Sequence, residues 1–260
     1  MSTDTDNDGS GAVGDSIMWA EVCAGGARRT LTHETADALL TVIEQARTRR
    51  PKVLVLTGDE DAWCFGGDVA AFASSQDRQG YIDELATRLH AAVSGLQSLD
   101  AIVFSVVDGV AAGAGMPLAA AGDIVLASSR ARFTLGYTKL GLTPDGGTTM
   151  LSASLGVHRL LYAALVNPVV DAETALRQGL VAEVVPPGDL MARAQELAEV
   201  LARGSAEALS TTKHLVRRQA LPAPAEALQR EQTALRAAAG STDAAEGLSA
   251  FVEKRSPSFA

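Results

Sequence analysis

Apolar residues form three short uninterrupted runs in the first half of the chain. They are VLVLTG at 53–58, AIVFSVV at 101–107 and DIVLAS at 123–128, and glycine closes or soon follows the first two. Continuous apolar runs of this length are typical of strands buried on both faces of a parallel sheet.

Segments of helical periodicity separate and follow these runs. Residues 35–49 carry apolar side chains at helical spacing, with Thr32 as a candidate cap, and 81–98 form a second amphipathic helix. This alternation predicts an α/β core with a parallel sheet, and from about residue 146 the pattern becomes almost entirely helical. The further expected helices are 147–166, 171–179, 189–203, 205–219, 223–239 and 242–253.

Composition narrows the classes of function. The chain has 260 residues, of which 47% are hydrophobic, so it can bury a large core. Its formal net charge of −9 argues against nucleic acid as a partner. Two cysteines without CxxC spacing and four scattered histidines predict neither a disulfide framework nor a metal site. No apolar run is long enough to span a membrane.

The N-terminal stretch MSTDTDNDGSGAVGD contains aspartates and no Lys or Arg. It lacks the positive start and apolar centre of a signal peptide. We therefore expect residues 1–14 to be a disordered tail and the protein to be cytoplasmic.

Two glycine-containing turns follow the first two apolar runs: WCFGGD at 63–68 and DGVAAGAGMP at 108–117. Ligands of open α/β sheets bind outside the carboxyl ends of the strands, and unpaired N–H groups at a helix start favour an anion. We expect the two turns to direct two backbone N–H groups at one anion or oxyanion. A dinucleotide site fits poorly because Leu118 replaces the third glycine of GxGxxG, and the GxSxG of serine hydrolases does not occur.

A third segment, LGYTKLGLTPDGGTT at 135–149, contains Asp145. The sequence Pro-Asp-Gly is a strong turn signal, so residue type alone predicts a turn aspartate that caps a helix beginning near Thr148.

Together these segments resemble the crotonase superfamily, the enoyl-CoA hydratase/isomerase family. The similar stretches are VLVLTGDEDAWCFGGDV, VVDGVAAGAGMPLAAAGDIVLASSRARF, KLGLTPDGGTT and, at 246–259, EGLSAFVEKRSPSF. The resemblance is strongest to the branch containing the ring-epoxide isomerase of phenylacetyl-CoA breakdown. It implies an α/β fold with a crotonase-like core of repeated ββα units over 15–200, a helical trimerisation region over 201–260, and a homotrimer or homohexamer.

The resemblance also implies an acyl-CoA substrate, with coenzyme A entering as part of the thioester and no permanently bound cofactor. Gly67 and Ala114 match the backbone donors of the oxyanion hole, each worth about 3 kcal/mol to an enolate-like transition state. The two glutamates of family hydratases fall on Pro117 and Tyr137, neither of which is a carboxylate. Proline is tolerated in the first turn of a helix. Asp145 matches the isomerase aspartate, and we expect it to move a proton from one carbon to another.

Two other functions stay open. In the aroyl-CoA dehalogenase branch, the positions of Asp145, His90 and Tyr137 hold a nucleophile, a base and an aromatic residue on the leaving side. His90 lies on the expected helix 81–98, where a lone histidine is commonly structural. The protein could instead be a non-catalytic CoA-binding subunit, since both hydratase glutamates are missing.

Several residues are assigned to CoA by the resemblance. Arg28 lies where the family places a basic residue near the nucleotide, and Phe251 and Lys254 match C-terminal residues that reach the CoA of a neighbouring subunit. Phe65, which replaces a small residue, and Asp68 flank the first oxyanion glycine and are assigned to the same binding site.

Two stretches are expected to border the site. Residues 74–82 (SSQDRQGYI) are expected to form a mobile wall of the acyl pocket. IMWAEVCAG leaves room for one strand where the family has a hairpin.

Overall fold

The larger of two sheets contains every long strand of the fold. The computed structural model describes residues 14–25 and 28–259. The sheet has five parallel strands in the order β1-β2-β4-β6-β9. They are β1 (Ile17–Glu21), β2 (Val53–Thr57), β4 (Ile102–Val107), β6 (Ile124–Ser128) and β9 (Glu183–Val185). The three predicted strands are confirmed, and IMWAEVCAG forms a single strand, β1, as expected.

A second, smaller sheet is built from strands of two or three residues in the order β3-β5-β7-β8. They are β3 (Ala62–Cys64), β5 (Val110–Ala112), β7 (Arg132–Thr134) and β8 (Val170–Asp171). β3, β5 and β7 are parallel, and each follows a strand of the large sheet after a short turn. The chain therefore repeats the order long strand, short strand, helix, which confirms the expected ββα core.

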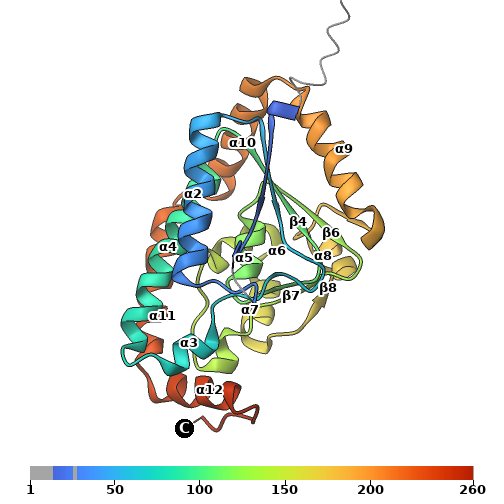
Figure 1. Ribbon diagram of the computed structural model, residues 1–260. Helices are drawn as coiled ribbons and strands as arrows, with labels where there is room; N and C mark the ends of the chain where they lie inside the picture. Colours follow the sequence, from blue (N-terminus) through green and yellow to red (C-terminus); the bar gives the residue numbers. More distant parts are fainter. Residues whose placement is uncertain (1–13, 26–27, 260) are drawn as a thin grey trace, which may run out of the picture.

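Helices cover both faces of the large sheet (Figure 1). α2 (His33–Arg49) and α4 (Arg78–Ser98) pack on one face with the side chains of Met18, Leu54 and Leu56. α9 (Leu190–Ala202) packs on the other face, against the alternate side chains of the same strands. Because successive strand residues point to opposite faces, strands covered twice need the continuous apolar runs seen in the sequence.

The N-terminus of α2 explains why its capping residue could be predicted from the sequence. The Thr32 hydroxyl accepts a hydrogen bond from the Thr35 N–H, and the Thr35 hydroxyl accepts one from the Thr32 N–H. This reciprocal pair satisfies N–H groups that have no partner inside the helix. The predicted cap at Thr32 is confirmed.

Short helices connect the sheets. They are α3 (Val69–Ser74), α5 (Gly115–Ala120), α6 (Ser152–Leu155), α7 (Val157–Val166), α8 (Ala172–Gln178) and the 3-10 helices η1 (Tyr137–Leu140), η2 (Thr148–Leu151) and η3 (Pro187–Asp189). The single helix expected over 147–166 is wrong: Gly156 adopts a φ of +73° and divides it. The stretch 74–82, expected as a mobile wall, is partly helical, since α3 ends at Ser74 and α4 begins after its cap Asp77; its mobility stays a prediction.

Three C-terminal helices complete the chain: α10 (Ala206–Ala220), α11 (Pro224–Ala239) and α12 (Thr242–Val252). α11 packs along α4, while α12 packs against α3 and η1 (Figure 1). The division at residue 200, the trimerisation role of 201–260 and the oligomeric state stay predictions.

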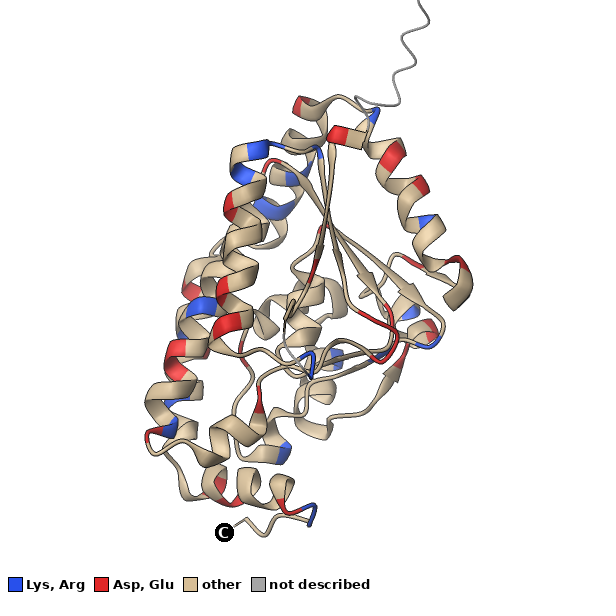
Figure 2. Ribbon diagram, viewed as in Figure 1, with Lys and Arg blue, Asp and Glu red and all other residues tan. Residues whose placement is uncertain are grey.

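Charged residues of both signs lie mainly on the outer helices, and the strands of the large sheet carry few (Figure 2). None of the described helices is both long and apolar enough to cross a membrane. The tail expected at 1–14 lies outside the described residues, except for Gly14.

Candidate active site

The two glycine turns meet beside the small sheet. Gly66 adopts a φ of +81°, and a Cβ on it would lie 2.7 Å from the Ala112 carbonyl oxygen and 3.1 Å from the Ala114 nitrogen. Only glycine permits this close approach of two backbones. The expectation that the turns converge is therefore met.

Gly67 and Ala114 both line the same pocket. Leu31 donates to the Gly66 carbonyl (2.7 Å) and accepts from the Asp68 N–H (3.2 Å), a parallel bridge in which the Gly67 N–H points away from Leu31. Within 14–25 and 28–259, no acceptor pairs with the N–H of Gly67 or Ala114. Two such donors suit an oxyanion.

Ala114 is the N-cap residue of α5, and Pro117 lies in the first turn of that helix. A first-turn residue needs no N–H for the helix, so proline fits there. Pro117 is buried and borders a separate cavity, whereas the pocket shared by Gly67 and Ala114 does not include it among its lining residues.

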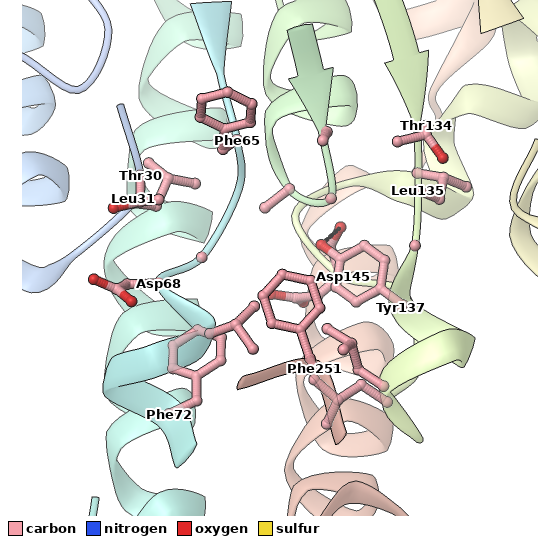
Figure 3. A pocket seen from close by; sticks show the side chains of 18 of the residues that line it. Thr30, Leu31, Phe65, Asp68, Phe72, Thr134, Leu135, Tyr137, Asp145 and Phe251 are labelled. Atoms are coloured by element: carbon pink, nitrogen blue, oxygen red, sulfur yellow. Dashed lines mark hydrogen bonds between the residues drawn. The ribbon is translucent and has the colours of Figure 1, made fainter. Parts of the chain in front are cut away.

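The pocket has a volume of about 810 Å³ and is lined by the small sheet, α3, α4, η1 and the C-terminal helices α11 and α12 (Figure 3). Eight of the ten predicted site residues line it: Gly67, Ala114, Tyr137, Asp145, Arg28, Phe65, Asp68 and Phe251. Its inner wall is apolar and includes Phe72, Ile82, Leu85, Leu142 and Leu235. An apolar cavity with few convergent polar groups is the usual form of a small-molecule site.

Asp145 is the one buried carboxylate among the described lining residues, with 2% of its surface exposed. Its Oδ1 lies 2.7 Å from Nε2 of His90, which comes from α4 and does not itself line the pocket. Its Oδ2 has no hydrogen-bond partner among the described residues. The structure therefore brings into direct contact two residues that the sequence analysis pairs in the dehalogenase alternative.

Tyr137 supports the backbone of Asp145. Its hydroxyl donates to the Asp145 carbonyl oxygen at 3.2 Å, and the Thr148 hydroxyl donates to the same oxygen at 2.7 Å. Burial, together with the negative charges of Asp145 and Glu231, raises the pKa of Tyr137 well above 10.0. A phenol held neutral in this way cannot replace a hydratase glutamate as a base.

Glu231 is a site residue that sequence reasoning missed. It is 3% exposed, and its carboxylate accepts hydrogen bonds from the N–H groups of Gly147 and Thr149, each at 2.7 Å. The helical spacing could have indicated that Glu231 is buried. It stands three residues after Leu228 and four before Leu235, on the buried face of α11.

His90, Asp145 and Glu231 bring ligand-type atoms within 4.8 Å of one another. Both oxygens of Glu231 already accept N–H groups, and His90 already pairs with Asp145. The sequence analysis predicted no metal site, and it did not predict that these three side chains would meet.

The two thiols lie next to the first oxyanion loop. Cys23 and Cys64 are both free and buried, with their sulfur atoms 3.5 Å apart. The Gly66 N–H donates to the Cys64 sulfur at 3.3 Å, so the thiol helps to shape the loop.

The sequence model described as "Enoyl-CoA hydratase/isomerase" matches residues 26–260. The chain belongs to the enoyl-CoA hydratase/isomerase family. A probable enoyl-CoA hydratase of Rhodobacter capsulatus is 35% identical over 235 residues, covering 88% of this chain and 87% of that protein. The 1,2-epoxyphenylacetyl-CoA isomerase of Escherichia coli is 36% identical over 232 residues, with 87% of each chain covered.

Solved structures of the family share the fold. The crystal structure of an enoyl-CoA hydratase from Mycobacterium avium subsp. paratuberculosis has a TM-score of 0.85 at 31% identity. It covers 95% of this chain and 96% of its own. The family name includes both hydratases and isomerases, so the arrangement of side chains has to separate them.

Four of the five residues assigned to CoA by similarity to the family line the pocket. Arg28 is exposed at the pocket, and Asp68 caps α3 by accepting from the N–H groups of Ala70 and Ala71. Phe65 and Phe251 line the pocket with 45% and 58% of their surfaces exposed. Phe251 thus lines the pocket of its own chain, while Lys254 is exposed and is not one of the described lining residues.

Proposed function

We propose that this family member isomerises an acyl-CoA by proton transfer, moving a double bond or rearranging a ring epoxide, with Asp145 as the acid and base. The observation that carries the proposal is the buried Asp145, which has one oxygen free of hydrogen bonds among the described residues. It lines the same pocket as Gly67 and Ala114, whose N–H groups have no acceptor within the described residues. The positions of the two hydratase glutamates hold Pro117 and Tyr137.

The proposed mechanism follows from these positions. The thioester oxygen accepts hydrogen bonds from Gly67 and Ala114, which stabilise the negative charge as a proton leaves the carbon chain. Oδ2 of Asp145 takes that proton and returns it to another carbon, while His90 holds Oδ1. The acyl group lies against the apolar wall, and the reaction needs no cofactor besides the CoA of the substrate.

Positional isomers of enoyl-CoA thioesters and a ring-epoxide thioester test the proposal. We expect isomer formation without uptake of ¹⁸O from labelled water, and a fall of about 10²–10⁴ in kcat for Asp145→Asn. Asp189→Asn is the matched control, since Asp189 is exposed and caps no helix with its side chain. Full isomerase activity of Asp145→Asn would refute the proposal.

A second candidate is hydrolytic dehalogenation of an aroyl-CoA. Asp145 would attack the ring carbon and release halide, and water activated by His90 would hydrolyse the ester. The contact of 2.7 Å between the two residues favours this candidate, whereas the absence of His90 from the pocket lining opposes it. Halide release from an aroyl-CoA would establish it.

A non-catalytic CoA-binding subunit is the third possibility. It would bind the same thioesters without turning them over, and Asp145→Asn would leave that binding unchanged.

A further inference from the structure

Glu231 is a buried carboxylate to which the proposed mechanism assigns no role. It comes from α11 and is 84 residues distant in sequence from Gly147, whose N–H donates to its Oε2. Its Oε1 accepts from the N–H and from the hydroxyl of Thr149. Three hydrogen bonds therefore fix the chain immediately after Asp145 and Gly146.

This part of the chain needs an external support. Gly146 and Gly147 both adopt left-handed conformations, with φ of +73° and +93°. Two consecutive glycines have wide conformational freedom, which a catalytic loop must lose to hold its carboxylate in place. His90 on α4 and Glu231 on α11, two helices that pack side by side, hold the loop from its two ends (Figure 1).

Glu231 also contributes charge. Its two oxygens accept N–H groups, an arrangement that fits the ionised carboxylate. Burial raises the pKa of Glu231, the hydrogen bonds from Thr149 and Gly147 lower it, and the charge of Asp145 raises it further. The titratable groups that face it are Asp145 from the loop, His90 from α4 and Tyr137 from η1.

We propose that Glu231 is a positioning residue that holds the Asp145 loop and whose buried carboxylate is electrostatically coupled to Asp145. The alternative is a purely structural role, in which Glu231 only caps η2. The kinetic part of this proposal rests on the proposed function, whereas its electrostatic part does not.

The kinetic test compares Glu231→Gln with Glu226→Gln, an exposed glutamate on the same helix. For Glu231→Gln we expect kcat to fall about 10–100-fold with KM changed less than about threefold. Thr149→Val removes one of the three hydrogen bonds to Glu231 and keeps its charge, so kcat should fall less than in Glu231→Gln. A lower melting temperature with an unchanged kcat would overturn the proposal.

The electrostatic test uses the folded protein without substrate. The carboxyl ¹³C resonance of Glu231 is titrated in the wild type and in Asp145→Asn. We expect the raised pKa of Glu231 to fall in the variant, since one of its causes is the charge of Asp145. An unchanged pKa would overturn the coupling. This measurement stays decisive if no acyl-CoA is isomerised, or if Glu231→Gln does not fold.

Discussion

Nε2 of His90 lies 2.7 Å from Oδ1 of Asp145, although 55 residues separate the two in sequence. Both side chains are buried, so water cannot supply an equivalent hydrogen bond if either partner is removed. A hydrogen bond to a charged group contributes about 1.5–3 kcal/mol.

This pair predicts a graded response at position 90. His90→Leu should lower kcat by about 10–100-fold, because the carboxylate loses the donor that orients it. His90→Gln retains an N–H donor and should keep more activity. Steady-state kinetics on the isomerised thioester, with circular dichroism as a folding control, provide the measurement. Equal activity of the two variants would mean that the hydrogen bond does not support catalysis.

The start of α5 predicts a steric effect on the oxyanion hole. A Cβ at Gly115 would lie 2.3 Å from the Cys64 carbonyl oxygen, closer than real Cβ contacts, so the backbone beside Ala114 must shift. We expect Gly115→Ala to lower kcat by about 10²-fold, the usual loss for one misplaced donor. Gly188→Ala is the matched control, since no atom lies within 4 Å of its added Cβ. Wild-type kcat in Gly115→Ala would contradict the assignment of Ala114.

Tyr137 predicts a change in stability at alkaline pH. Its pKa in the folded protein is raised well above 10.0, first because the phenol is buried. Above pH 10.0 the unfolded chain therefore releases this proton while the folded chain keeps it. The contribution of Tyr137 to stability is fully present below pH 10.0 and is lost as the pH rises towards the raised pKa.

Tyr137→Phe removes that pH dependence. Its free energy of unfolding should fall less steeply above pH 10 than that of the wild type, as measured by urea denaturation at a series of pH values. Parallel curves for the two proteins would show that the phenol ionises freely in the folded state.

Replacing Lys213, which lies outside the candidate active site, should lower the stability of the protein strongly. Its side chain is 1% exposed, and Nζ lies 2.9 Å from Oδ2 of Asp123 and 2.8 Å from the Ala101 carbonyl oxygen. Lys213→Ala should lower the free energy of unfolding by about 3–5 kcal/mol, because it removes the buried partner of the Asp123 carboxylate, whose side chain is 11% exposed.

The control for Lys213 is Arg218→Ala, an exposed position on the same helix. Urea denaturation should show a change within about 0.5 kcal/mol for this variant. A similarly small change for Lys213→Ala would mean that Arg217, which also pairs with Asp123, can hold that carboxylate alone.

The short strands mark one limit of sequence reasoning. β3, β5 and β7 have three residues each and lie within turn-rich segments, so none completes a recognisable alternation. These short strands form because each follows a long strand directly, and the paired long strands place β3, β5 and β7 side by side. The break at Gly156 was hidden for a similar reason, since alanine and leucine on both sides continue the helical pattern.

The sequence by itself determined the family, the long strands, the cap at Thr32 and eight of the residues that line the pocket. These depend on apolar runs, on glycines that permit close approach, and on motifs contiguous in the chain. Only the tertiary structure decided which buried charges meet. His90, Asp145 and Glu231 come from α4, a loop and α11, and a carboxylate on an amphipathic helix looks the same in sequence whether solvent or a catalytic loop faces it. Packing of α11 against α4 removes water from Glu231 and leaves backbone N–H groups as its partners.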